Sequence, residues 1–267
     1  MPGYGNLESK ILHQNLFNMK RNCFFFSLLL FSFLAPDRDR VKIFIAGDST
    51  ASIKEVRVYP ETGWGMPFVW FWDSTVTVIN KAKNGRSTSS FRKEGLWQQI
   101  MDEASAGDYV IIQFGHNDEV STKKTFTTET AFKNNLQQYV KEARAKNAIP
   151  LLLTPMARRK FDSTGKISGT HDIYAQIIRD VAKEEKVILF DMDKLTQALY
   201  QQFGEMNSRL LFLQLKPGEH PNYPEGKEDN THFSELGARL VAQLVLNEIK
   251  EKCPDLATHI IKPGVKK

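Results

Sequence analysis

The chain has 267 residues, of which 41% are hydrophobic and 25% charged, and its formal net charge is +5. This composition is typical of a globular protein with one large α/β domain or two small ones. Residues 1–35 hold two lysines and one arginine against one glutamate, a net +2, which leaves +3 for residues 36–267. No long basic stripe with interleaved aromatic residues occurs, so the sequence argues against a nucleic-acid-binding protein.

The first 35 residues have the pattern of an export signal. Lys20 and Arg21 precede an apolar run over 23–34, which ends at the small residue Ala35 and is followed by polar residues. A charged segment before a short apolar core is typical of a secretory signal peptide, and the run is short for a membrane span. We therefore expect cleavage, no stable membrane span afterwards, and a secreted or periplasmic bacterial protein. An uncleaved anchor helix is the alternative, and Met1 and Met19 are both candidate starts.

Cysteine usage agrees with an exported protein that needs no disulfides. After cleavage only Cys253 would remain, which excludes both a disulfide framework and a cysteine-based metal site. A core of this size can be stable without such cross-links. No linker or internal repeat divides residues 36–267, so we expect a single domain and a monomer.

From residue 41 onward, short β-branched apolar runs alternate with helical patterns. The runs show little polar alternation, which indicates strands buried on both faces and hence a parallel sheet with helices on each side. The repeated β-α order predicts one three-layer α/β/α domain. The expected strands are Val41–Ala46, Val76–Asn80, Tyr109–Phe114, Ile149–Thr154 and Val187–Asp191.

Two of the expected helices have clear apolar faces. One follows Thr128 and the other follows Ser234, a candidate N-cap. The aromatic run from Trp64 to Trp72 predicts a core helix. Three longer irregular stretches are candidate site loops, because they exceed the length of simple connections: residues 50–63, 156–170 and 204–230. The apolar positions of the two helices are Phe132, Leu136, Tyr139, Val140 and Ala143 in the first, and Leu236, Leu240, Val241, Leu244, Val245 and Ile249 in the last.

Five residues that are common in active sites, four with polar side chains and one glycine, follow expected strands or precede the last expected helix. Ser49 comes after the first strand, Gly85 shortly after the second, and Asn117 directly after the third, while Asp229 and His232 precede the last helix. In a parallel α/β sheet, ligands bind outside the carboxyl ends of the strands. We therefore expect these residues to meet at one end of the sheet.

Each of these residues suits one role in acyl transfer. A serine hydroxyl becomes a nucleophile when an imidazole accepts its proton, and a carboxylate fixes the tautomer of that imidazole. Asp229 and His232 are three positions apart, so one turn of chain could set the carboxylate beside the ring. The Ser49 N–H, the Gly85 N–H and the Asn117 amide could bind an oxyanion. Glycine at 85 would let the backbone approach the substrate closely.

Taken singly, these signals have ordinary structural explanations. Gly-Asp-Ser after a strand is a common turn, Asn117 could cap or turn the chain, and Asp229 could begin a helix. His116 is expected to be a structural hydrogen-bonding residue or a substrate contact. His171 and His220 are isolated and are expected to be solvated.

Two further expectations concern ligands. No pair of histidine or carboxylate residues has convincing metal-ligand spacing within one element, so we expect no metal site. Trp64 is the aromatic residue of its run nearest the candidate site, and it is a candidate for lining a sugar subsite.

The order of the motifs resembles the four blocks of the SGNH (GDSL-type) hydrolases, and within them the rhamnogalacturonan acetylesterase branch. The similarity covers roughly residues 41–250, and no core position departs from the pattern. The stretches that carry the resemblance are Gly47-Asp48-Ser49-Thr50, Gly63-Trp64-Gly65, Asn84-Gly85-Arg86-Ser87-Thr88-Ser89-Ser90-Phe91, Phe114-Gly115-His116-Asn117-Asp118, Thr154-Pro155-Met156-Ala157-Arg158-Arg159 and Asp229-Asn230-Thr231-His232-Phe233.

This resemblance implies a flavodoxin-like fold with a five-stranded parallel sheet. It implies that Ser49 is the nucleophile, with His232 as base and Asp229 as its partner, and that Ser49, Gly85 and Asn117 form the oxyanion hole. No metal or organic cofactor is implied.

The implied substrate is an O-acetylated pectic polysaccharide, with rhamnogalacturonan favoured. Arg158, Arg159 and the 204–230 stretch are where substrate preference is expected to be set, with Arg158 a candidate contact. The alternatives are an SGNH esterase or lipase for acetylated xylan or a short-chain lipid, and a non-catalytic carbohydrate-binding protein.

Overall fold

The structure is a computed structural model, and it describes residues 40–262 and 264. The signal peptide predicted over 1–35 lies outside these residues. The described part of the chain belongs to one compact unit that begins at Arg40. Within it, no helix is both long enough and apolar enough to cross a bilayer.

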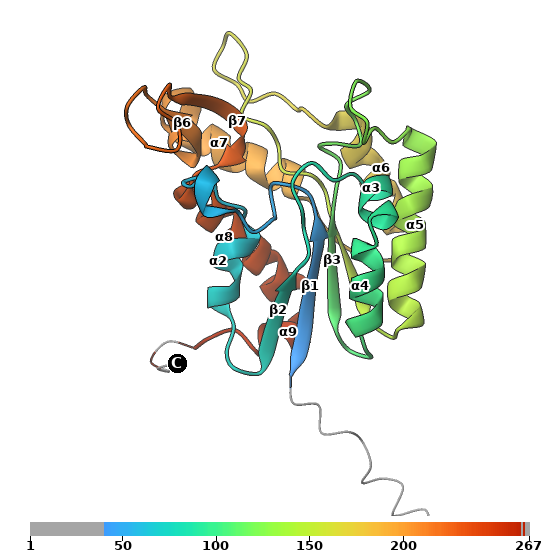
Figure 1. The fold of residues 1–267 in the computed structure, drawn as a ribbon. Helices are drawn as coiled ribbons and strands as arrows, with labels where there is room; N and C mark the ends of the chain where they lie inside the picture. The colour runs from blue at the N-terminus through green and yellow to red at the C-terminus, as the bar shows by residue number, and fades with distance from the viewer. Residues whose placement is uncertain (1–39, 263, 265–267) are drawn as a thin grey trace, which may run out of the picture. The chain divides into compact units, whose positions relative to one another are not determined.

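The centre of the fold is a five-stranded parallel sheet with the strand order β2-β1-β3-β4-β5. Figure 1 shows β2, β1 and β3 side by side. All five residues of β3 and the last five of β1 are buried, as expected for strands covered on both faces. The predicted three-layer α/β/α fold is therefore confirmed, although β5 is shorter than predicted. The strands are β1 (Val41–Gly47), β2 (Val76–Asn80), β3 (Tyr109–Gln113), β4 (Ile149–Leu153) and β5 (Ile188–Phe190).

Alternate side chains of β1 enter two hydrophobic clusters, one on each face of the sheet. Ile43 and Ile45 pack with residues from α2, α7, α8 and α9, whereas Phe44 and Ala46 pack with residues from α3, α4, α5 and α6. Figure 1 shows these two groups of helices on opposite sides of the sheet. This division follows from the two-residue period of a strand. The helices are α2 (Gly65–Phe68), α3 (Thr88–Lys93), α4 (Leu96–Glu103), α5 (Glu129–Ala145), α6 (Asp172–Glu184), α7 (Met192–Asn207), α8 (Glu235–Lys252) and α9 (Pro254–Ala257).

Both predicted helix starts are capped by the expected side chains. The Thr128 hydroxyl accepts a hydrogen bond from the N–H of Ala131, and the Ser234 hydroxyl accepts one from Gly237. The predicted apolar face of α5 is buried throughout. In α8 the prediction was wrong at Leu236, whose side chain is 45% exposed because the first turn of the helix lies at the surface.

The aromatic run is broken into shorter elements than predicted. It forms α2 and then the 3-10 helix η3 (Val69–Phe71), while Trp70 remains exposed. Trp64, Phe68 and Trp72 are buried, and the ring of Phe68 meets the other two edge-on. The run therefore belongs to the core, although not as one helix.

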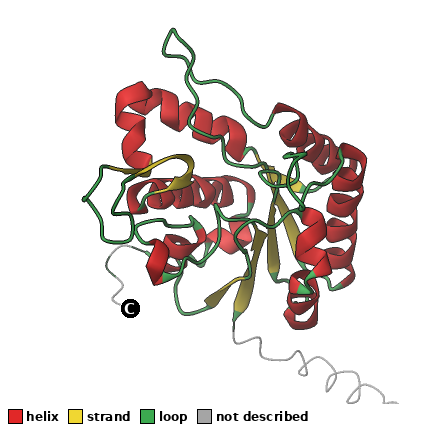
Figure 2. Cartoon of the chain, turned by 45° about the horizontal axis from the view of Figure 1, so that its top comes forward, coloured by secondary structure: helices red, strands yellow, loops and turns green. Residues whose placement is uncertain are grey.

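The stretch 204–230, predicted as irregular, contains regular structure. After α7 and the 3-10 helix η4 (Ser208–Leu211), strand β6 (Phe212–Leu215) pairs antiparallel with β7 (Lys227–Phe233). Asp229 and His232 therefore lie on a strand, and not at a helix start. By contrast, 156–170 contains no helix or strand, as expected, and 50–63 contains only the short 3-10 helix η2 (Val56–Val58). Loops gather over the carboxyl end of the sheet (Figure 2).

Candidate active site

The structure brings Ser49, His232 and Asp229 into one hydrogen-bonded chain. Ser49 lies two residues beyond β1, and the other two residues come from β7. His232 Nε2 is 3.0 Å from Ser49 Oγ, and His232 Nδ1 is 2.8 Å from Asp229 Oδ2. Because a carboxylate only accepts hydrogen bonds, the ring proton belongs on Nδ1, and Nε2 is left to accept the serine proton.

Asp229 is fixed by its own backbone as well as by the imidazole. Its Oδ1 accepts hydrogen bonds from the N–H of Thr231 at 2.7 Å and of His232 at 2.9 Å. Burial opposes the charge, but the His232 ring and these two backbone groups hold the pKa of Asp229 at about 2. The carboxylate is therefore ionised at any ordinary pH and can stabilise a protonated imidazole.

Neighbouring segments hold β7 in place around Asp229 and His232. The N–H of Thr62 donates to the carbonyl of Phe233 at 3.0 Å, and the N–H of Arg159 donates to the carbonyl of Asn230 at 2.8 Å. From β6, the side chain of Gln214 donates to the carbonyl of Asp229 at 2.8 Å. The positions of Asp229 and His232 are thus set by contacts from three separate parts of the chain.

The turn that presents Ser49 is built around Asp48, which is fully buried. Its Oδ1 accepts hydrogen bonds from the backbone N–H and the hydroxyl of Thr50, at 2.9 and 2.8 Å. Its Oδ2 lies 3.3 Å from His116 Nδ1. Although burial raises it, the pKa of Asp48 is about 2, because His116 and Thr50 stabilise the carboxylate. The Gly-Asp-Ser stretch is therefore an ordinary Asx turn that also exposes the serine hydroxyl to His232.

The amide of Asn117 is oriented by two contacts. Its Oδ1 accepts a hydrogen bond from Lys123 Nζ at 2.8 Å, and its Nδ2 donates to the carbonyl of Arg86 at 3.1 Å. An amide nitrogen carries two hydrogens, and the Arg86 contact uses one of them. Since Arg86 adjoins Gly85, the contact also places Asn117 beside the second candidate oxyanion donor.

Gly85 has a left-handed backbone with a φ of 77°. A Cβ built at this position would meet no atom within 4 Å. In the free protein the need for glycine therefore comes from the left-handed backbone conformation, and the predicted close approach to a substrate stays a prediction. The open space beside it is available to a substrate.

A buried network of charged groups lies next to the Asp48 turn. His171 is 1% exposed, in contrast to the prediction of a solvated residue, because its Nδ1 lies 2.9 Å from Glu119 and its ring packs 4.4 Å from that of His116. Burial, together with His171 and Arg158, lowers the pKa of His116 to about 4, against the pull of Asp48. Arg158 completes the network through an ion pair of 2.6 Å with Glu119.

Two of the three candidate substrate contacts are therefore enclosed. Trp64 is fully buried, and its Nε1 donates to Gln113 Oε1 at 2.9 Å, so the expectation that it lines a sugar subsite is corrected. His116 is 4% exposed and has the structural role that was its other interpretation. Arg158 keeps a partly exposed side chain.

Sequence reasoning missed a buried lysine at the site. The side chain of Lys54 is 2% exposed and contacts both the Ser49 carbonyl and Asn84. A lysine in a loop is normally solvated, and only the position of Lys54 five residues after Ser49 could have drawn attention to it.

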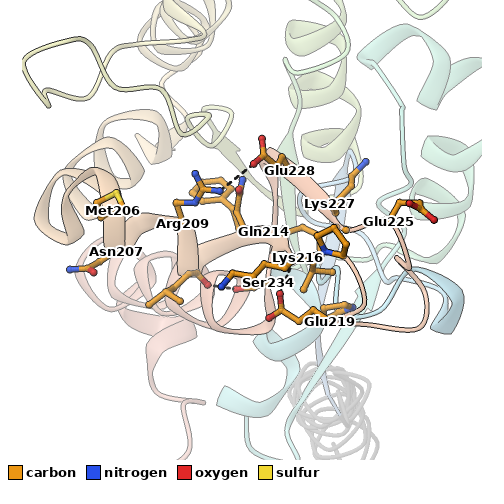
Figure 3. Close-up of a pocket in the computed structure, with 17 residues that line it drawn as sticks. Met206, Asn207, Arg209, Gln214, Lys216, Glu219, Glu225, Lys227, Glu228 and Ser234 are labelled. Carbon is orange, nitrogen blue, oxygen red and sulfur yellow. Dashed lines mark hydrogen bonds and ion pairs between the residues drawn. The ribbon is translucent and has the colours of Figure 1, made fainter.

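A pocket of about 790 Å³ lies beside β7 (Figure 3). The pocket is lined mainly by η4, by strands β6 and β7, and by the loop between these two strands. The lining residues on β7, Lys227 and Glu228, directly precede Asp229. Its lining carries charges of both signs, including an ion pair of 3.5 Å between Arg209 and Glu228, and it is next to the exposed side chain of Leu210. Across the described residues, no group of three histidine, cysteine or carboxylate side chains is arranged to hold a metal ion.

The sequence matches the GDSL-like lipase/acylhydrolase family over residues 46–240. The chain belongs to this family. The matched range contains Ser49, Gly85, Asn117, Asp229 and His232, and the resemblance to the SGNH (GDSL-type) hydrolases is confirmed.

Relatives and solved structures agree with this family. The chain is 41% identical to "Rhamnogalacturonan acetylesterase RhgT" of Bacillus subtilis (strain 168), over 83% of this chain and 94% of that protein. It is 35% identical to "Probable rhamnogalacturonan acetylesterase YesY" of the same organism, over 82% and 97%. The crystal structure of the YxiM protein of Bacillus subtilis superimposes with a TM-score of 0.69 and 28% identity, and the match covers 80% of this chain and 57% of that one.

Proposed function

We propose that this family member is a serine carbohydrate esterase that removes O-acetyl groups from pectic polysaccharide, with rhamnogalacturonan as its substrate. The observation that carries the proposal is the continuous contact from Ser49 through His232 to Asp229, at 3.0 and 2.8 Å. The similarity to RhgT and YesY, which are named a rhamnogalacturonan acetylesterase and a probable one, supports the choice of substrate.

In the proposed reaction, Ser49 Oγ attacks the acetyl carbonyl while His232 Nε2 takes the hydroxyl proton. The resulting oxyanion accepts hydrogen bonds from the Ser49 N–H, the Gly85 N–H and the Asn117 amide. When the tetrahedral intermediate collapses, the sugar alkoxide leaves with the proton held by His232, and an acetyl group stays on Ser49. Water then gives a proton to His232 and attacks the acetyl carbonyl. When this second tetrahedral intermediate collapses, acetate leaves and His232 returns the proton to Ser49 Oγ, which restores the free serine. Asp229 stabilises the protonated imidazole in both halves, and every step uses groups of this chain and water.

The pocket beside β7 is a suitable place for the remainder of the glycan. Its lining comes mostly from residues 206–228, the stretch expected to set substrate preference, and its Lys227 and Glu228 directly precede Asp229. Carbohydrate sites combine polar side chains with apolar surface, and Arg209 and Leu210 supply both here.

We also propose that the signal segment 1–35 is removed and that the remaining residues 36–267 form a single domain. In this proposal the mature protein is a monomer that acts in the periplasm or outside the cell.

The decisive experiment is a screen of acetate release from acetylated rhamnogalacturonan, homogalacturonan, xylan and mannan. We expect the highest kcat/KM on rhamnogalacturonan, and a preference for p-nitrophenyl acetate over the butyrate and longer esters. Activity that rises with acyl-chain length, or that is highest on xylan, would replace the pectic assignment by one of the alternative ester substrates. A protein that binds the glycan but releases no acetate would support the non-catalytic alternative.

A further inference from the structure

Lys54 is the most completely partnered lysine near the candidate site. Its Nζ donates to the carbonyl of Ser49 at 2.5 Å and to Asn84 Oδ1 at 2.8 Å, and forms an ion pair of 2.7 Å with Glu61. Its side chain is only 2% exposed, and that of Glu61 is 11% exposed. A buried lysine with this many partners costs free energy to desolvate, so its position calls for a physical reason.

The geometry requires the charged form of Lys54. An ammonium group has three hydrogens and no acceptor, and the carbonyl of Ser49, the amide of Asn84 and the carboxylate of Glu61 use all three. Burial lowers the pKa of Lys54, and the carboxylate of Glu61 is the largest effect that raises it. Glu61 thus keeps the lysine charged without exposing it to water.

Two of the three partners belong to the acyl-transfer site. The first is the carbonyl of Ser49 itself, the residue whose hydroxyl contacts His232. The second is Asn84, which directly precedes Gly85 and whose Oδ1 also accepts a hydrogen bond from Ser52 at 2.6 Å. Ser49 and Asn84 come from loops after different strands, β1 and β2. Lys54 therefore links the loop that carries the nucleophile to the loop that carries a candidate oxyanion donor.

We propose that Lys54 is a positioning residue of the esterase reaction, which holds the backbone of Ser49 and the Asn84–Gly85 segment in fixed relative positions. This inference rests on the proposed roles of Ser49 and Gly85. Because the Lys54 side chain is 2% exposed and its Nζ has three protein partners, we expect its contribution to appear in the chemical step and not in binding. A displacement of about 1 Å in the reacting groups can cost about 100-fold in rate.

The test compares Lys54→Met with Lys252→Met, a control that is matched in the kind of partner but has a side chain 36% exposed. Lys252 Nζ also contacts a backbone carbonyl, that of Leu189 at 3.0 Å, and a carboxylate, that of Glu248 at 2.7 Å. It lies at the end of α8, and its polar partners among the described residues, Leu189 and Glu248, are not part of the candidate site. Steady-state kinetics on p-nitrophenyl acetate would be normalised to active sites titrated with a serine-directed phosphonate, and thermal melting would report folding.

We expect Lys54→Met to lose about 100-fold in kcat per titrated site, with KM changed by less than about threefold. Lys252→Met should lower the melting temperature without changing kcat per site. If Lys54→Met has wild-type kcat per site and is merely less stable, or if only KM rises, the positioning role is wrong.

The double variant Lys54→Met/Glu61→Gln covers the case in which the single variant fails to fold. It removes both charges and leaves no unpaired carboxylate, and the same loss of kcat is expected from it. Wild-type kcat in this variant would overturn the inference. Ser49→Ala separates the two proposals: an inactive Ser49→Ala beside a fully active Lys54 variant refutes only the role of Lys54, whereas an active Ser49→Ala refutes the proposed nucleophile itself.

Discussion

Replacing Asp229 by asparagine should reverse the tautomer of His232. In the native structure, Asp229 Oδ1 accepts two backbone N–H groups, at 2.7 and 2.9 Å, while Oδ2 faces His232 Nδ1 at 2.8 Å. In Asp229→Asn the amide oxygen must stay at the Oδ1 position, since only an acceptor suits the two N–H donors. The amide NH₂ then faces Nδ1 and donates to it.

A donated hydrogen bond at Nδ1 forces the imidazole proton onto Nε2. The ring would then present an N–H to Ser49 Oγ across the same 3.0 Å, and could not accept the serine proton. The same change in serine hydrolases costs about 10⁴-fold in kcat, which corresponds to about 5 kcal/mol of transition-state stabilisation. We expect a loss of this size here, with KM nearly unchanged.

The measurement is steady-state hydrolysis of p-nitrophenyl acetate by Asp229→Asn and by Asp162→Asn. Asp162 is a matched control, because its Oδ1 also accepts backbone N–H groups, those of Thr164 at 2.8 Å and Lys166 at 3.1 Å, in an exposed loop. The control should retain wild-type kcat. A kcat for Asp229→Asn within tenfold of wild type would refute the tautomer argument, and equal losses in both variants would indicate a general effect of the substitution.

Two further predictions concern the oxyanion donor and the buried histidine. Asn117→Ala should lower kcat by about 10²- to 10³-fold with little change in KM, because the amide acts on charge that develops only in the transition state; an effect confined to KM would contradict this role. His116 has its pKa lowered to about 4 from 6.5, so the unfolded chain binds more protons between these values and the free energy of unfolding should fall as pH drops from 6.5 to 4. The loss should be about 3 kcal/mol at most, measured by urea unfolding at several pH values, and His116→Gln should flatten it. An unchanged slope in this variant would show that other groups cause the pH dependence.

The sheet was predictable because its strands are buried on both faces. Short, mostly apolar and β-branched runs such as Val41–Gly47 and Tyr109–Gln113 indicate buried strands when helical patterns separate them. Strand β7, with the sequence Lys-Glu-Asp-Asn-Thr-His-Phe, was missed because it is nearly all polar. It is stabilised by backbone pairing with β6 and by contacts from distant segments, which leave no periodic signal in the sequence.

That Ser49, Asp229 and His232 would lie together was predictable from residue types and order, whereas their surroundings were not. Ser49 and His232 could be paired because each supplies what the other lacks in acyl transfer. The burial of His171 depends on Glu119, more than fifty positions earlier, and that of Lys54 depends on Glu61 across a turn. Such pairs form through folding, and a single sequence contains no periodicity that reveals them.

The central claim is that Ser49 carries the acetyl group during turnover. It is tested most directly by acid-quenching the enzyme during hydrolysis of p-nitrophenyl acetate and locating the modified peptide by mass spectrometry. We expect an acetyl group on Ser49 in the wild-type enzyme, and neither modification nor turnover in Ser49→Ala. Turnover without acetylation of Ser49, or an acetyl group carried on another residue in the Ser49→Ala variant while hydrolysis continues, would contradict the proposed mechanism.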